Sequence, residues 1–408
     1  MIKKIVIFIC FIIIALLYSI GDFSSVKKLS VKDLKQYFVK NKILPEYPKG
    51  TIHIYTDDAT FPTELQLFDM IQRPADTPKI ISWNWNRFPN LNLDPYNATK
   101  LDFSFFRRLT NYDKRKIDNF IEELKNLENN DFVIHANLLG IASVIPLLKE
   151  LPKEKIKHIY LYEDGLANHL ASTTSIPAAQ VNNLGEQDLT KIFLNADKFS
   201  SKYAYFLHKY YPVTYRITYW NEFKKRPLLG NFLELMKDAD VENVNLQEIA
   251  NTLTDEQKKE LFNIFNFDVD FYKKMIANKK VHFFVVGHYL TYNNEDLQEW
   301  FDQHNSPDDI LFIKGSNNML ANRLIPAFNF PNQLPFEMLV IGDLIPTSVS
   351  GVSSSLFYAL PKGNIGKIIY DKNDSNAETI RKLKDLTDTQ IKFSDVEYFE
   401  KVEDGKEQ

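Results

Sequence analysis

The chain has 408 residues, of which 44% are hydrophobic and 13% aromatic, so it can bury a substantial core and is expected to form two domains. Its formal net charge of −4, from 49 basic and 53 acidic residues, gives no global electrostatic attraction for nucleic acid. The single cysteine, Cys10, excludes an intrachain disulfide and a cysteine-built zinc site. The absence of a dinucleotide fingerprint or a Walker loop argues against nicotinamide, flavin or ATP chemistry.

Residues 1–23 are expected to be a signal or membrane-anchor segment. Lys3 and Lys4 precede an uncharged apolar run over residues 5–20, which is slightly shorter than the roughly 20 residues that span a bilayer. A cleaved signal and a retained short anchor are therefore both open, and lysines on both sides of the run leave its orientation undetermined. We expect membrane association. Residues 24–49 are polar and lysine-rich and are expected to be a linker.

The folded body alternates short β-prone runs with helical patterns. A first series of runs covers residues 51–55, 79–83, 131–135 and 158–162, and a second series covers residues 282–286, 310–314, 338–341 and 367–370. A helix after Asn111 repeats its apolar residues on one face, namely Ile117, Phe120, Ile121, Leu124 and Leu127. Between the two series, residues 215–278 are expected to be helical, with a capping box at Thr254.

Strands that alternate with helices predict parallel sheets covered on both sides. The predicted fold class is therefore α/β, with two Rossmann-like domains facing a central cleft. Residues 50–210 are expected to form the first domain and residues 211–372 the second. Residues 373–408 are expected to contain a helix over 377–386 that packs back on the first domain.

An acidic motif follows the predicted strand over residues 158–162. Glu163, Asp164 and Gly165 should lie where this strand emerges into a loop, which is where ligands gather in open α/β sheets. Successive side chains point in different directions, so one carboxylate can face the cleft while the other holds the loop. A solvated turn at Gly165 is the alternative interpretation.

A serine-rich segment follows Gly351 in the second half. Ser353, Ser354 and Ser355 precede an apolar run that ends before Pro361, which is typical of a helix start. Free backbone N–H groups and the helix dipole attract phosphate at such a start, although serines there are also ordinary N-caps. A carboxylate on one wall of a cleft and a phosphate site on the other suit glycosyl transfer from a nucleotide donor, with the carboxylate as general base. The first domain is then expected on the acceptor side and the second on the nucleotide-donor side.

These residues resemble the bacterial GT-B sialyltransferases of glycosyltransferase family 80. The resemblance extends from about Thr51 to Tyr370. The motifs that carry it are Tyr55 to Pro62, Arg87-Phe88, Tyr162 to Gly165, Tyr211 to Tyr215, Leu253 to Gln257, Phe336 to Leu339 and Gly351 to Pro361. Each motif alone is weakly specific, whereas their order and spacing together are fairly specific.

The resemblance implies an inverting, metal-independent enzyme that moves sialic acid from CMP-sialic acid to a galactose-terminated glycan such as lipooligosaccharide. No cofactor is implied beyond this donor substrate. Asp164 would be the general base, Glu337 would hold the ribose hydroxyls, and the serine pair would donate to the CMP phosphate. The implied donor-binding residues are Lys314, Gly315, Ser316, Glu337, Ser354 and Ser355, and the implied acceptor-binding residues are Thr60, Arg87, Asn137 and Tyr292.

The chain departs from the family pattern at three positions. Ser316 stands where the family has a histidine, and serine donates hydrogen bonds but is not a cationic acid. Gly140 stands where a histidine lines the acceptor side, and Tyr292 is expected to stack in place of a tryptophan. His288 can replace the missing histidine, although a solvated or core histidine is the favoured interpretation. For His135, at the end of a buried-looking strand, the structural interpretation is favoured as well.

The aromatic residues Trp83, Trp85 and Phe88 form either a sugar-stacking platform or plain core.

Two alternative functions remain open. One is the same fold with a different CMP-linked or nucleotide-sugar donor, and the other is a glycan-binding protein that has lost catalysis. Because CMP-sugars are made in the cytoplasm, we expect association with the inner membrane and a cytoplasmic active site.

Overall fold

The computed structural model describes residues 43–57, 60–105, 114–138, 140–163, 181, 183–193, 201–218, 220–223, 230–286, 294–315, 325–352, 360, 362–371 and 391–394. The chain divides into two compact units, Met1–Pro45 and Glu46–Gln408, and the elements below belong to the second. The apolar run over residues 5–20 and the predicted helix over 377–386 lie outside the described residues. Within the described part, no helix is long and apolar enough to cross a membrane.

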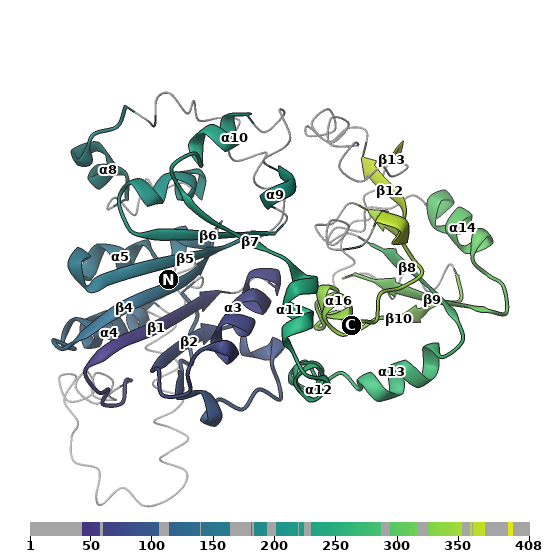
Figure 1. Cartoon of the computed structure of the whole chain (residues 1–408), viewed down its shortest axis with the longest axis horizontal. Coiled ribbons are helices and arrows are strands. Elements are labelled where there is room, and N and C mark those ends of the chain that lie inside the picture. The colour runs from purple at the N-terminus through teal and green to yellow at the C-terminus, as the bar shows by residue number, and fades with distance from the viewer. Residues whose placement is uncertain are drawn as a thin grey trace, which may run out of the picture. The chain divides into compact units, whose positions relative to one another are not determined.

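The first sheet contains seven parallel strands in the described part of the chain, in the spatial order β3-β2-β1-β4-β5-β6-β7 (Figure 1). These strands are β1 (Gly50–Asp57), β2 (Lys79–Trp83), β3 (Ala98–Lys100), β4 (Asn130–Asn137), β5 (Ile156–Tyr162), β6 (Val213–Thr218) and β7 (Asp240–Val244). The helices between them are α3 (Thr60–Gln72), α4 (Lys114–Lys125), α5 (Ile145–Glu150), α8 (Glu186–Phe193), α9 (Trp220–Phe223) and α10 (Gly230–Leu235). Short 3₁₀ helices are η1 (Trp85–Arg87), η2 (Asp94–Tyr96), η4 (Gly140–Ser143), η5 (Lys153–Lys155) and η6 (Ser201–Lys209).

The second sheet contains six parallel strands among the described residues, in the order β10-β9-β8-β11-β12-β13. They are β8 (Lys280–Val285), β9 (Asp309–Lys314), β10 (Phe328–Asn329), β11 (Ser348–Val352), β12 (Ile365–Asp371) and β13 (Ile391–Ser394). The accompanying helices are α11 (Leu246–Thr252), α12 (Asp255–Ile264), α13 (Val269–Ile276), α14 (Asn294–Gln303), α16 (Glu337–Ile341) and the 3₁₀ helix η8 (Lys362–Asn364). Two parallel sheets confirm the predicted α/β class.

Three sequence predictions differ from the structure. Residues 338–341 form most of α16, not a strand, because a short run that is apolar on all sides has no period to distinguish the two. Residues 215–278 are not helical throughout, since they contain β7 and most of β6. These strands join the first sheet, so the boundary predicted at residue 211 is too early, and the strands of the second sheet begin at Lys280.

The capping box at Thr254 is confirmed. The Thr254 hydroxyl accepts from the backbone N–H of Gln257, and the Gln257 side chain accepts from the Thr254 N–H. This reciprocal pair satisfies two of the free N–H groups at the start of α12. The helix it begins carries Leu261 and Phe262 into a large hydrophobic cluster, which Phe265 joins directly after the helix ends.

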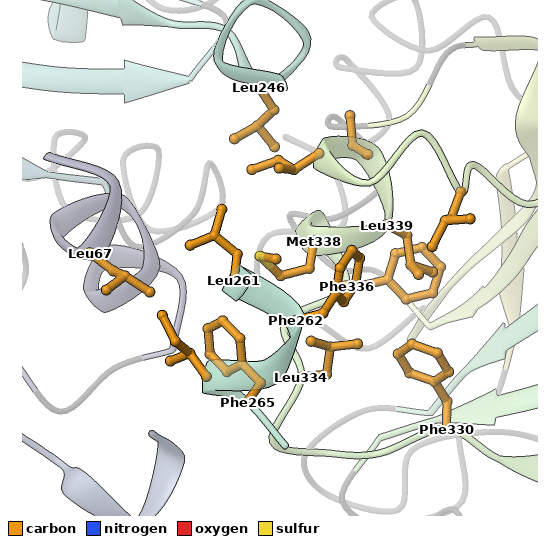
Figure 2. Close-up of a cluster of buried hydrophobic side chains, with 14 of the residues drawn as sticks. Leu67, Leu246, Leu261, Phe262, Phe265, Phe330, Leu334, Phe336, Met338 and Leu339 are labelled. Carbon is orange, nitrogen blue, oxygen red and sulfur yellow. The ribbon is translucent and has the colours of Figure 1, made fainter. Parts of the chain in front are cut away.

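This cluster joins α3 to the elements around the second sheet. Leu67 of α3 is fully buried and belongs to the same cluster as Leu261 and Phe265, together with Phe336 and Met338 at α16 (Figure 2). Burying a side chain of this size contributes about 1.5–3 kcal/mol. The packing thus fixes α3 relative to α16, and both helices carry side chains of the candidate site.

Candidate active site

Several predicted site residues lie outside the described residues, and their roles stay predictions. They are Asp164, Ser316, Ser354 and Ser355, together with Tyr292 and His288. Thr60 is the first residue of α3. The strands that precede Asp164, Ser316 and the serine pair in the sequence are described. Strand β5 ends at Tyr162, β9 at Lys314 and β11 at Val352. In parallel sheets these are the carboxyl ends, the edge where ligands bind.

Asn137 and Asp57 meet at this edge of the first sheet. They end the neighbouring strands β4 and β1, and the Asn137 Nδ2 lies 3.5 Å from the Asp57 Oδ1. The Asn137 Oδ1 accepts from the backbone N–H of Gly140 at 3.2 Å. A side chain at Gly140 would meet the Asn137 Cβ at 3.2 Å, so the glycine allows this close turn. Arg87, partly exposed, follows β2 on the same sheet.

Glu163 holds the end of β5. Its side chain is buried, and its Oε2 accepts from the backbone N–H of Thr218 at 2.6 Å. The Glu163 N–H in turn donates to the carbonyl of Arg216. Of the two adjacent acids, Glu163 therefore ties the chain to the end of β6, immediately before Asp164.

A buried ionic network lies at the carboxyl half of the first sheet. The Asp69 carboxylate of α3 accepts from Arg73 at 2.6 Å and from Arg216 at 2.6 Å, and the Tyr55 hydroxyl donates to it at 2.7 Å. The same guanidinium of Arg216 donates to the Tyr162 hydroxyl at 3.0 Å. Burial opposes ionisation of Asp69, but the two arginines outweigh it and hold its pKa well below the usual range.

His135 is a structural part of this network. Its side chain is fully buried, with the Nδ1 2.8 Å from the Tyr162 hydroxyl and the Nε2 2.9 Å from the Nδ1 of His53. Burial holds the pKa of His135 well below its usual range, so the imidazole is neutral. The structural interpretation of His135 agrees with this placement.

The aromatic residues after β2 serve mainly as core. Trp83 is 1% exposed and donates its Nε1–H to Gln66, and Phe88 is 4% exposed and packs on Phe265, which follows the last residue of α12. Trp85 is partly exposed, and its Nε1–H donates to the carbonyl of Leu101 at 2.8 Å. Neither Trp83 nor Phe88 presents a face to a sugar.

Lys314 organises the turn that precedes α16. Its ammonium donates to the carbonyl oxygens of Pro331 at 2.7 Å, Asn332 at 3.2 Å and Leu334 at 2.8 Å, which uses its three protons. Burial lowers the pKa of Lys314 to about 8, although Glu337 and Glu64 oppose this shift. Glu337 begins α16, is 7% exposed, and has a pKa raised by burial.

Two glycines allow the strand ends of the second sheet to approach. Gly315 has φ +145°, and a Cβ there would lie 2.1 Å from the carbonyl oxygen of Val286. Gly351 has φ +123°, and its Cβ would lie 2.3 Å from the carbonyl oxygen of Val285. Only glycine fits either position. The predicted donor residue Gly315 is thus required by the backbone itself.

The sequence analysis missed Glu64. This residue lies in α3, is 0% exposed, and interacts electrostatically with Glu337 and Lys314. Glu64 is flanked in the sequence by Leu65 and Leu67, but the residue type alone favours a solvated position for a glutamate. Among the described residues, no group of histidine, cysteine, aspartate and glutamate side chains is arranged to hold a metal ion.

Comparisons with known proteins agree on the fold. The family model described as sialyltransferase PMO188 matches residues 310–394. An alpha/beta-galactoside alpha-2,3-sialyltransferase of Photobacterium phosphoreum superposes with a TM-score of 0.68 at 20% identity, over 84% of this chain and 99% of that one. A sialyltransferase of Photobacterium damsela gives a TM-score of 0.66 at 19% identity, over 84% and 81% of the two chains.

A third solved structure is a 2,6-sialyltransferase of a Vibrionaceae Photobacterium species, in a ternary complex with CMP and lactose. It gives a TM-score of 0.64 at 17% identity, over 84% of this chain and 78% of that one. A comparison with curated proteins finds no match. The chain therefore has the fold of the bacterial GT-B sialyltransferases, which confirms the resemblance predicted from the sequence.

Proposed function

We propose that the protein transfers sialic acid from CMP-sialic acid to a galactose-containing acceptor, with inversion and without a metal ion. The observation that carries this proposal is the sialyltransferase family match over residues 310–394. That range contains the end of β9, the Glu337 helix and the serine segment after β11. The similarity in fold to a 2,6-sialyltransferase that holds CMP and lactose supports the same donor and acceptor classes.

In the proposed reaction, Asp164 takes the proton of the acceptor hydroxyl as that oxygen attacks the anomeric carbon of sialic acid. The new bond joins the acceptor oxygen to this carbon, and the bond to the phosphate oxygen breaks with its electron pair on CMP. Ser354 and Ser355 donate hydrogen bonds to the phosphate as its charge grows. The anchoring of Glu163 to Thr218 fixes the backbone immediately before the base.

Glu337 accepts from the two ribose hydroxyls of the donor with its two carboxylate oxygens. Lys314 contributes indirectly, because its protons bind the carbonyls of the turn at residues 331–334 that leads into α16. We assign it a positioning role for Glu337 rather than a phosphate contact. Ser316 supplies a neutral donor where the family has a histidine, so the leaving CMP carries its own negative charge away.

The acceptor in the proposed function is a galactose-terminated surface glycan such as lipooligosaccharide. Residues 1–23 would keep the enzyme at the inner membrane, with the site on the cytoplasmic side where CMP-sugars are made. Asn137, Arg87, Thr60 and Tyr292 are the proposed acceptor contacts. Asn137 is in register with Tyr162, the last residue of β5 and two positions before Asp164 in the sequence, and this supports its assignment.

The test is CMP release from CMP-N-acetylneuraminic acid by the full chain in detergent, with and without lactose. Acceptor-dependent release, with a sialylated product identified by mass, supports the proposal. CMP release at the same rate with and without lactose indicates a different acceptor. A glycan-binding protein without catalysis would retain galactosides and release no CMP, and binding of another nucleotide sugar alone would move the assignment to that donor.

A further inference from the structure

Two phenylalanines of the second half of the chain are exposed to solvent. Phe271 of α13 is 63% exposed and Phe328 of β10 is 55% exposed, and they are the exposed large hydrophobic side chains of the described part of the chain. Each ring leaves apolar surface in water that burial would remove favourably. Single exposed apolar residues are common, whereas a shared apolar surface marks a place where a partner binds.

Phe328 and α13 lie on the same face of the second sheet. Phe328 is paired in register with Phe312 of the neighbouring strand β9, and the centroids of the two rings are 5.8 Å apart. The Phe312 ring in turn lies 5.6 Å from that of Tyr272, the buried residue that follows Phe271 in α13. Helix α13 therefore packs on the sheet face from which Phe328 projects, beside the edge strand β10 (Figure 1).

The charges around this surface suit an anionic partner. The exposed charged residues at α13 and directly after it are four basic and two acidic ones, namely Lys273, Lys274, Lys279 and Lys280 against Asp268 and Asp270. Asp270 is already paired with Lys259 of α12. Residues 325–334, which contain β10, carry no charge. The surface is thus locally basic with an uncharged edge, in a chain whose formal net charge is −4.

An anionic lipid bilayer fits this combination better than a protein does. Phenylalanine together with lysine is typical of contacts at the membrane interface, where rings enter the headgroup region and ammonium groups bind lipid phosphates. Protein interfaces are instead depleted of lysine. In the proposed function, on which this inference rests, residues 1–23 tether the chain to a membrane. A tether raises the local concentration of the bilayer, so that a weak second contact becomes populated.

We propose that Phe271, Phe328, Lys273 and Lys274 form a surface that binds the anionic bilayer to which residues 1–23 tether the chain. The two rings lie among the lipid headgroups, and the two ammonium groups bind the phosphates. This contact fixes the orientation of the second sheet relative to the membrane. An acceptor glycan carried on a lipid would then reach the protein from a defined side.

The test places a tryptophan in each ring position and measures its contact with lipid. Phe271→Trp and Phe328→Trp are made in the full chain and reconstituted into vesicles of phosphatidylcholine and phosphatidylglycerol with acyl chains brominated near the headgroup. Bromine quenches tryptophan only at contact, so the emission that each substitution adds to the unaltered chain should be largely lost. Arg115→Trp, exposed on α4 of the first sheet, is the matched control and should keep its added emission.

The charge requirement is tested with Lys273→Gln and Lys274→Gln together in the Phe271→Trp chain. Loss of both ammonium groups should shift the equilibrium between quenched and unquenched tryptophan by about tenfold or more toward the unquenched form. Vesicles of phosphatidylcholine alone should have the same effect on the chain with both lysines. Equal quenching with and without the lysines would overturn the proposed electrostatic contact.

Full emission from either added tryptophan in brominated vesicles would overturn this inference. If the chain still floated with the vesicles in a density gradient, the proposed tether would stand. Failure of the unaltered chain to float would refute the proposed membrane localisation as well. Equal quenching of Arg115→Trp would also overturn the inference, because the tether would then bring any surface to the lipid. A shift of the added emission to shorter wavelength with rising protein concentration, without vesicles, would assign the surface to a second copy.

Discussion

Replacing Asp69 by asparagine should destabilise the first half of the protein strongly. The Asp69 side chain is 5% exposed and neutralises both Arg73 and Arg216, whose side chains are 23% and 17% exposed. Removing one partner of a buried ion pair costs about 3–5 kcal/mol, because the remaining charge stays buried without compensation. Arg216 keeps its ion pair to the half-exposed Glu242 and its hydrogen bond to the Tyr162 hydroxyl, so part of its pairing is retained. We therefore expect the lower part of this range, about 3 kcal/mol.

The measurement is urea unfolding at pH 7, followed by the fluorescence of the tryptophans, which include Trp83 of the same cluster as Tyr55. The control is Asp102→Asn, which removes an equally short ion pair to Lys116, with N–O distance 2.6 Å, on a carboxylate that is 77% exposed. A surface pair of this kind contributes about 0–1 kcal/mol. If Asp69→Asn lost no more free energy of unfolding than Asp102→Asn, the assignment of the buried network as a stabilising core would be refuted.

Three further predictions concern catalysis, donor binding and acid stability. Asp164→Asn should lower turnover by about 10²–10⁴-fold and leave CMP affinity intact, and unchanged transfer rates would exclude it as the base. Alanine at both Ser354 and Ser355 should weaken CMP binding, and unaltered affinity by calorimetry would contradict the phosphate site. Burial lowers the pKa of His53 to about 4, below the ordinary value near 6.5, so the unfolded chain binds this proton first. The contribution of neutral His53 to the free energy of unfolding is complete above pH 6.5, and about 3 kcal/mol of it is lost as the pH falls toward 4. His53→Gln should therefore flatten this part of the profile of stability against pH, measured by urea unfolding. An equally steep profile would refute protonation of His53 as the cause.

The sequence predicted the elements whose pattern is local. Strand β9 contains the continuous apolar run from Ile310 to Ile313, and the capping box from Thr254 to Gln257 is a four-residue motif, so each can be recognised without the rest of the chain. The α16 helix could not, because Met338 to Ile341 is apolar in every direction and fits either a strand or a buried helix. Strand β6 was missed because its Arg216 looks like a surface residue, although its guanidinium is buried against Asp69.

The candidate site was predictable where a motif lies at a strand end, and less so where function depends on distant pairs. Glu163 and Glu337 could be found from their local motifs, but the choice of Glu163 as the loop anchor needs its contact with Thr218. Arg216 and Asp69 are separated by 147 positions, and no sequence spacing indicates that they meet. Glu64 was missed for the same reason, since its neighbours Glu337 and Lys314 belong to the other sheet's elements.

The pair Lys314-Gly315 keeps the family pattern although the next residue, Ser316, departs from it. Lys314 binds three carbonyls of the turn before α16, and Gly315 adopts a φ of +145° where any Cβ would strike the backbone of Val286. Both residues are therefore required by the fold whether or not the site has a cationic acid. Ser316 lies outside the described residues, and the effect of its exchange on leaving-group chemistry stays a prediction. A kept Lys-Gly motif is consequently evidence for the fold, and evidence for sialyl transfer must come from Asp164, the serine pair and the measured release of CMP.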